Sequence, residues 1–375
     1  MNKIKSTSFL DGIRGFAAFY VLMHHARWLL TESYSYRQQL NFGNSLLNKV
    51  SSNALSFFRY GHEMVILFFV LSGFVIHLSV LKTFGQKKFS KKFWLNYFIK
   101  RFNRIYPPFV FALVFTFFVD CLGMYYFNFP FYSHGSKYST LILDSKNFTS
   151  IVFLGNFFNL QGLVSNIPFF GSDGALWSLS YEWWFYLLYP FFFWIHRKSK
   201  LFAFLLMLSL YILTQYFISN LYCPILFPIF QKMIIWWLGV LLAEVYVGNI
   251  TFKFRYLSFL LFLIPISVLF FYHELFSDLL WGIGFIGLLS YLIGLSETSF
   301  ILKSINKLKF IGDGSYTLYL IHEPILYFFH AYLVNKFNGS LPMSYSYMFL
   351  IPIFIFGFTY LLSNKLEKLR PFQNF

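Results

Sequence analysis

Apolar stretches of about twenty residues recur along this chain, and they constrain its fold more than any other feature. A helix of that length crosses the hydrocarbon core of a bilayer, where every backbone N–H and C=O group needs a hydrogen-bond partner within the protein. The sequence therefore predicts an all-α, polytopic membrane protein with about ten transmembrane helices, organised as a single domain over residues 1–375. The expected spans are residues 11–30, 61–81, 105–122, 178–196, 201–219, 227–247, 255–272, 279–296, 312–334 and 345–364.

Composition and charge support a membrane protein and exclude an ordinary soluble domain. The chain is 58% hydrophobic and only 12% charged, whereas about a quarter of the residues in a soluble domain carry charge. A formal net charge of +16 would suit nucleic acid, but most of the basic residues lie in short segments between the spans. We therefore expect contact with membrane lipids and no nucleic-acid partner.

The distribution of basic residues sets the expected orientation. With the N-terminus in the cytoplasm, 21 of the 30 Lys and Arg residues fall in the inner segments and seven in the outer segments. This bias alternates from loop to loop, as the positive-inside rule requires. It predicts that both termini are cytoplasmic.

Arg14 and His25 are two of the ionisable residues in the first apolar stretch. Arg14 and His25 are eleven residues apart, so a helix places them on one face and about 16 Å apart. Charged groups inside a membrane are costly and commonly mark a functional path. The alternative is that Arg14 reaches the lipid headgroups and His25 is a buried polar group with a partner. Asp11 is expected to cap this helix and to pair with Arg14.

Two segments are expected to lie along the membrane surface instead of crossing it. Residues 151–170 are too short and polar to span, and read as a re-entrant or interfacial piece on the outer face. Residues 93–104 read as a short interfacial helix that Pro107 and Pro108 end. Cys121 and Cys223 fall near outer ends of spans; a disulfide is one option, and two free thiols are the expected state.

Five segments of the chain resemble the integral-membrane acyltransferase-3 family, which O-acylates bacterial surface sugars and some secondary metabolites. They occur in the order found in that family, and the chain is similar to its short members without an appended extracytoplasmic esterase-like domain. The segments are Leu10 to Arg14 with His25, Phe68 to Ile76, Arg101 to Pro107, Leu176 to Pro190, and Ile311 to Pro324.

The resemblance implies an O-acyltransferase of the bacterial cytoplasmic (inner) membrane, with acetyl as the expected group. Acetyl-CoA or another acyl-CoA would be the cytoplasmic donor, and a hydroxyl of a cell-envelope polysaccharide or glycolipid the acceptor. Arg101 and Arg104 fall in a matching segment and would bind the donor phosphates, because guanidinium groups bind phosphate by paired hydrogen bonds. The alternative is that both arginines only set topology and contact headgroups.

Catalytic roles follow from the same segments. His25 is the candidate base that takes the proton of the acceptor hydroxyl. Glu182 is the candidate carboxylate that orients His25. Arg14 would add a third cation to Arg101 and Arg104 in binding the donor. Glu182 can instead be a structural partner of another buried polar group. His322 either satisfies carbonyls that Pro324 frees or contacts the acyl donor.

Several alternatives remain open at this level. Direct transfer and a transient acyl-histidine fit the residues equally, and neither requires a metal. Trp183 and Trp184 replace a Glu and a Gln that commonly follow in the family, which places the acceptor contacts there in doubt. The rival function classes are a transporter or lipid-linked glycan flippase, disfavoured by the lack of internal repeats, and an acyltransferase acting on a small metabolite.

Overall fold

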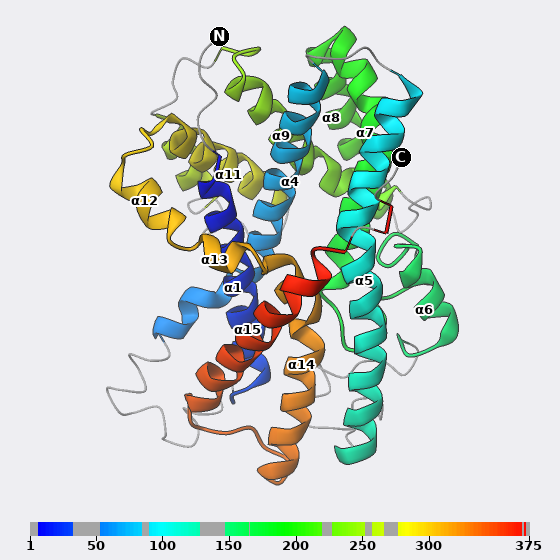
Figure 1. Ribbon diagram of the computed structural model, residues 1–375, viewed down its shortest axis with the longest axis vertical. Helices are drawn as coiled ribbons and strands as arrows, with labels where there is room; N and C mark the ends of the chain where they lie inside the picture. The colour runs from blue at the N-terminus through cyan, green and yellow to red at the C-terminus, as the bar shows by residue number, and fades with distance from the viewer. Residues whose placement is uncertain are drawn as a thin grey trace.

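The computed structural model describes residues 7–32, 53–84, 90–127, 147–164, 166–219, 227–251, 257–265, 277–369 and 371–372. These residues form helices and no strands (Figure 1). The helices are α1 (Phe9–Leu29), η2 (Phe57–Arg59), α4 (Gly61–Phe84), α5 (Lys91–Phe127), α6 (Ser150–Phe157), α7 (Leu176–Lys198), α8 (Lys200–Ser219), α9 (Pro228–Tyr246), η6 (Leu257–Phe262), α11 (Ser277–Gly294), α12 (Phe300–Asn306), α13 (Lys309–Gly312), α14 (Ser315–Lys336) and α15 (Ser346–Leu366).

The helices agree with the expected class of an all-α, multi-pass membrane protein. Six of the described helices are long and apolar enough to cross a bilayer, namely α4, α5, α8, α9, α11 and α15. Helices α1, α7 and α14 have 21, 23 and 22 residues and coincide with three more expected spans, but they carry more polar side chains. The described part of the expected span 255–272 is mainly the 3-10 helix η6. Ten spans and two cytoplasmic termini stay predictions.

Helix α5 differs from the sequence prediction. It continues for 37 residues through Pro107 and Pro108, so the interpretation of residues 93–104 as a separate interfacial helix is wrong. Proline removes one backbone donor, but a helix packed between neighbours tolerates this loss. Helix α5 packs against α7 and α14, and the Tyr316 hydroxyl donates a hydrogen bond to the carbonyl oxygen of Ile105 at 3.2 Å. Figure 1 shows α5 running along nearly the whole long axis.

Helix α1 packs closely against α13, and glycines make this contact possible. A Cβ atom at Gly15 would overlap the backbone of Gly312, and one at Gly312 would overlap the carbonyl oxygen of Asp11. The first and last of the five family-like segments therefore lie against each other. Helix α1 begins at Phe9, so Asp11 lies in its first turn and is not the cap. Its carboxylate does pair with Arg14, at 3.2 Å, as predicted.

Segment 147–175 contains one short helix and then folds back toward the bundle. Helix α6 has eight residues, too few to cross a bilayer, as the sequence predicts. The side chain of Asn156 holds the fold-back, because its amide donates to the carbonyl of Pro168 at 2.8 Å and its carbonyl accepts from Phe170 at 3.1 Å. Cys121 in α5 is a free thiol, and Cys223 lies outside the described residues.

Helices α4 and α9 also approach closely at small residues. A Cβ atom at Gly73 would overlap the carbonyl oxygen of Trp236, and one at Gly239 would overlap that of Val70. Small residues are common where membrane helices approach each other, because lipid supplies no hydrophobic force between helices. Gly73 and Gly239 therefore lie at the position where α4 and α9 approach each other closely.

Replacing Gly239 by Ala should therefore destabilise the bundle. The added methyl group meets backbone atoms that cannot rotate away, and overpacking of this kind costs about 1–3 kcal/mol. Gly357→Ala is the matched control, because a Cβ atom there meets nothing within 4 Å. Thermal unfolding in detergent should show a lower Tm for Gly239→Ala and an unchanged Tm for Gly357→Ala. Equal Tm values for the two variants would contradict the packing described here.

Candidate active site

His25 of α1 and His322 of α14 lie side by side where these two helices meet. Nδ1 of His25 is 3.0 Å from Nε2 of His322. The two rings stack with their centroids 5.1 Å apart and an angle of 18° between their planes. The sequence singled out both residues, and the structure brings them into direct contact.

A backbone hydrogen bond fixes the protons on this histidine pair. Nδ1 of His322 lies 2.8 Å from the carbonyl oxygen of Tyr319, which only accepts, so Nδ1 carries the hydrogen. Nε2 of His322 then has a lone pair and accepts the hydrogen on Nδ1 of His25. His25 is left with an unprotonated Nε2, which makes no hydrogen bond to the described residues. This nitrogen is able to take up a proton.

Glu323 supplies the carboxylate beside His25. Its Oε1 is 3.4 Å from Nδ1 of His25, and its side chain is only 7% exposed. Its Oε2 accepts a hydrogen bond from the backbone N–H of Ala175, at the end of the fold-back segment. A carboxylate held at this position stabilises the imidazolium that forms when His25 takes up a proton.

Glu182 of α7 has different partners from those that the sequence suggested. Its Oε1 accepts hydrogen bonds from the Ser72 hydroxyl, at 2.6 Å, and from the Tyr186 hydroxyl. Trp236 donates in turn to the Ser72 hydroxyl at 3.2 Å. Among the described residues, Glu182 and His25 form no hydrogen bond or ion pair with each other, contrary to the prediction. The face of α7 that carries Glu182 is turned toward α4. Glu323 takes that place instead.

Glu182 lines a pocket between α1, α4, α5, α7 and α14. The pocket encloses about 750 Å³, a volume that includes open solvent. Two guanidinium groups, those of Arg14 and Arg104, face it together with the hydroxyl groups of Ser72, Tyr316 and Tyr319. The pocket therefore combines a carboxylate, two cations and several hydroxyl groups within an apolar bundle.

Arg104 has fewer polar contacts within the protein than Arg14. Arg14 pairs with Asp11, and its side chain is 22% exposed. Arg104 is exposed and makes no hydrogen bond or ion pair with the part of the chain that the structure describes. An arginine with free N–H groups beside a pocket is suited to bind a planar or tetrahedral anion.

Arg101 faces a second, separate pocket. It is 9% exposed, and its guanidinium group lies 5.7 Å from the ring of Tyr97 and 6.0 Å from the ring of Tyr186. Lys92 and Lys100 also line this second pocket. Three helical residues turn through about 300°, so side chains at this spacing point about 60° apart. The structure thus separates the pair of arginines that the sequence grouped.

Tyr319 connects the first pocket to the histidine pair. Its ring lines the pocket, and its hydroxyl lies 2.7 Å from that of Ser178. Its backbone carbonyl binds His322, which contacts His25. Tyr319 therefore links the histidine pair to the pocket that Arg14 and Arg104 line.

Two partners in this site were not predicted from the sequence. Tyr186 is four residues after Glu182 and therefore on the same face of α7, a spacing that could have indicated their contact. Glu323 follows His322 directly, but only the crossing of α1 and α14 shows that its carboxylate reaches His25. No spacing within the sequence carries that information.

A comparison with protein families matches an acyltransferase domain to residues 7–363 of the 375-residue chain. No curated protein and no solved structure gives a significant match. The matched region covers nearly the whole chain and includes every residue of the histidine pair and both pockets. It confirms the resemblance seen in the five segments and favours an enzyme over a transporter. The protein belongs to the acyltransferase-3 family and is a membrane-bound acyltransferase.

Proposed function

We propose that this protein transfers an acyl group, with acetyl as the expected group, from acyl-CoA to a hydroxyl of a cell-envelope polysaccharide or glycolipid. The observation that carries the proposal is the position of Tyr319, which lines the pocket of Arg14 and Arg104 and whose backbone carbonyl binds His322 of the histidine pair. Acyl transfer from a phosphate-bearing thioester needs both features, a proton acceptor for the attacking hydroxyl and cations for the phosphates.

The donor is assigned to the side of Arg104. This guanidinium has no partner among the described residues, and Arg14 faces the same pocket. Phosphate oxygens of acyl-CoA would satisfy these donors, and the long, flexible pantetheine arm would carry the thioester toward Tyr319. Arg101, Lys92 and Lys100 around the second pocket would extend the binding surface for the nucleotide. His322, with both ring nitrogens engaged, is assigned to positioning His25 and not to holding the donor.

The transfer itself needs one base. Nε2 of His25 takes the proton of the acceptor hydroxyl while the hydroxyl oxygen attacks the thioester carbonyl carbon. The resulting tetrahedral intermediate collapses, the C–S bond breaks, and the CoA thiolate leaves with the proton that His25 returns. Glu323 stabilises the imidazolium between these two steps, and His322 keeps the hydrogen of neutral His25 on Nδ1. Direct transfer therefore balances without any metal.

The orientation expected from the basic segments places Arg14, Arg101 and Arg104 toward the cytoplasm. In a bacterial cytoplasmic membrane, acyl-CoA would then reach the protein from the cytoplasm. The charges of acyl-CoA prevent this molecule from crossing the bilayer. The acceptor would reach His25 from the outer side, where surface glycans and their lipid-linked precursors are found. The proposal is thus a transfer through the membrane.

Replacing His25 by Ala should abolish transfer while the protein still folds. General base catalysis contributes about 10²- to 10⁴-fold, and we expect a loss of at least this size in kcat. Glu323→Gln should lower kcat less, because the amide keeps an oxygen near His25 but loses the charge. Both variants are assayed at matched protein content after Tm and elution profile have been compared with wild type. Full activity of folded His25→Ala would refute the assignment of the base.

Replacing Arg104 by Ala should weaken donor binding. A charge-assisted hydrogen bond contributes about 1.5–3 kcal/mol, so the KM for acyl-CoA should rise about ten- to a hundredfold. Lysine should restore binding only in part, because it keeps the charge but loses the planar fork. Lys309→Ala is the matched control, since this exposed cation lines neither pocket. An unchanged KM for acyl-CoA with a raised KM for the acceptor would place the donor elsewhere.

Sealed membrane vesicles test the direction of transfer. Inside-out vesicles should use added acyl-CoA without detergent, and right-side-out vesicles should use it only after permeabilisation. Labelling of cysteines engineered into the loops reports the orientation of the same vesicles. The reverse preference would contradict transfer through the membrane. Product found only on the side of the donor would instead support a small metabolite as acceptor.

A further inference from the structure

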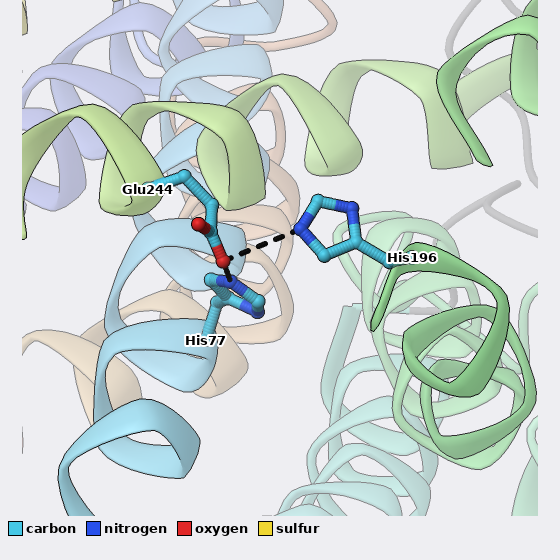
Figure 2. Close-up of side chains that lie close together, drawn as sticks. All are labelled: His77, His196 and Glu244. Atoms are coloured by element: carbon cyan, nitrogen blue, oxygen red, sulfur yellow. Dashed lines mark hydrogen bonds and ion pairs between the residues drawn. The ribbon is translucent and has the colours of Figure 1, made fainter. Parts of the chain in front are cut away.

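A second polar cluster lies apart from the acyl-transfer site, between α4, α7 and α9 (Figure 2). It consists of His77, His196 and Glu244, whose side chains are 0%, 1% and 3% exposed. Figure 2 shows both imidazole rings directed at the same carboxylate oxygen of Glu244. Nε2 of His77 lies 2.8 Å and Nε2 of His196 lies 3.3 Å from Oε1 of Glu244. One potential ligand atom from each residue lies within 4.8 Å of the others.

Outer contacts hold two of these side chains in the orientation that a metal site needs. The other ring nitrogen of His77, Nδ1, lies 2.8 Å from the Tyr189 hydroxyl. The other carboxylate oxygen of Glu244, Oε2, lies 2.6 Å from the ammonium group of Lys200. Metal-bound histidine usually donates its second N–H to a neighbour, and a metal-bound carboxylate is itself hydrogen-bonded. Both ligands therefore have the supporting contacts found around metal ions.

The hydrogens of the two histidines decide which atoms of this cluster can bind a metal ion. Without a metal ion, both imidazoles would have to donate Nε2–H to Oε1, and Nδ1 of His196 would then be a buried acceptor with no hydrogen-bond partner. Oε1 of Glu244 only accepts, so without a metal ion it holds the hydrogen of His196 on Nε2. Binding a metal ion through this nitrogen would move that hydrogen to Nδ1. With the hydrogen of His77 on Nδ1 and donated to Tyr189, three lone pairs converge on one point.

We propose that His77, His196 and Glu244 bind one divalent transition-metal ion, zinc by its ligand chemistry. Two imidazole nitrogens and one carboxylate oxygen are a ligand set that zinc accepts, with an open position left for water or for the second carboxylate oxygen. Ligand atoms about 2.1 Å from a tetrahedral ion are about 3.4 Å apart, so the site closes with movements below about 1 Å. The ion ties α4, α7 and α9 together and takes no part in acyl transfer.

Zinc content of the purified protein is the direct test. The chain is produced without a polyhistidine tag, purified in detergent, passed through metal-free buffer and analysed by plasma mass spectrometry. We expect one zinc per chain, a rise of Tm when zinc is restored after chelation, and an X-ray absorption spectrum with two imidazole nitrogens about 2.0 Å from the metal. His77→Ala and Glu244→Gln should both lose the zinc and the rise of Tm.

Two further variants serve as controls. His62→Ala removes the histidine of a comparable cluster with Asp278 and Lys232, which contains only one imidazole, and should keep the zinc. Lys200→Met should bind zinc more weakly, by about 10- to 100-fold, without losing the site, because Lys200 contacts the carboxylate and is not a ligand. A wild-type protein that retains no zinc and shows no rise of Tm with added zinc would overturn the proposal. Wild-type zinc content in folded His77→Ala would overturn it as well.

Discussion

The close contact of α1 with α13 and α14 is the constraint on which the rest of the site depends. Gly15 and Gly312 allow the backbones to touch, and this contact sets the position at which α1 continues past α14. Only at that position do the rings of His25 and His322 stack and does Glu323 reach Nδ1 of His25. A bulkier interface would separate these groups and leave each of them as an unpaired polar side chain inside an apolar bundle, at a cost of several kcal/mol.

The fold class could be predicted from the sequence because membrane helices depend on local composition. An apolar run of sufficient length is enough to predict a helix, and most of the expected spans coincide with one in the structure. Local rules failed at Pro107 and Pro108, where packing against neighbouring helices outweighs the loss of backbone donors. They failed also at Asp11, which lies inside the first turn of its helix.

The candidate site could be predicted only in part, for a related reason. Spacing along one helix correctly indicated that Arg14 and Asp11 interact, and a family resemblance singled out His25 and His322. Which carboxylate faces His25 depends on how three helices are rotated about their own axes, and this rotation is not written in any one segment. Glu182 and Glu323 are equally plausible until α7 and α14 are placed. The cluster of His77, His196 and Glu244 comes from three helices far apart in the sequence and has no local signal at all.

Helix α5 has a consequence for the energetics of ligand binding. Its 37 residues extend for about 55 Å, which is longer than the hydrocarbon core of about 30 Å. Arg101 and Arg104 therefore lie on a long helix and not on a loop. Asn103 of the same helix is hydrogen-bonded to the backbone of Phe372 near the C-terminus. A loop must lose backbone freedom when it closes on a charged ligand, and this loss subtracts from affinity. The backbone of a helix has already lost this freedom, so an anion bound by Arg101 or Arg104 would restrict only their side chains.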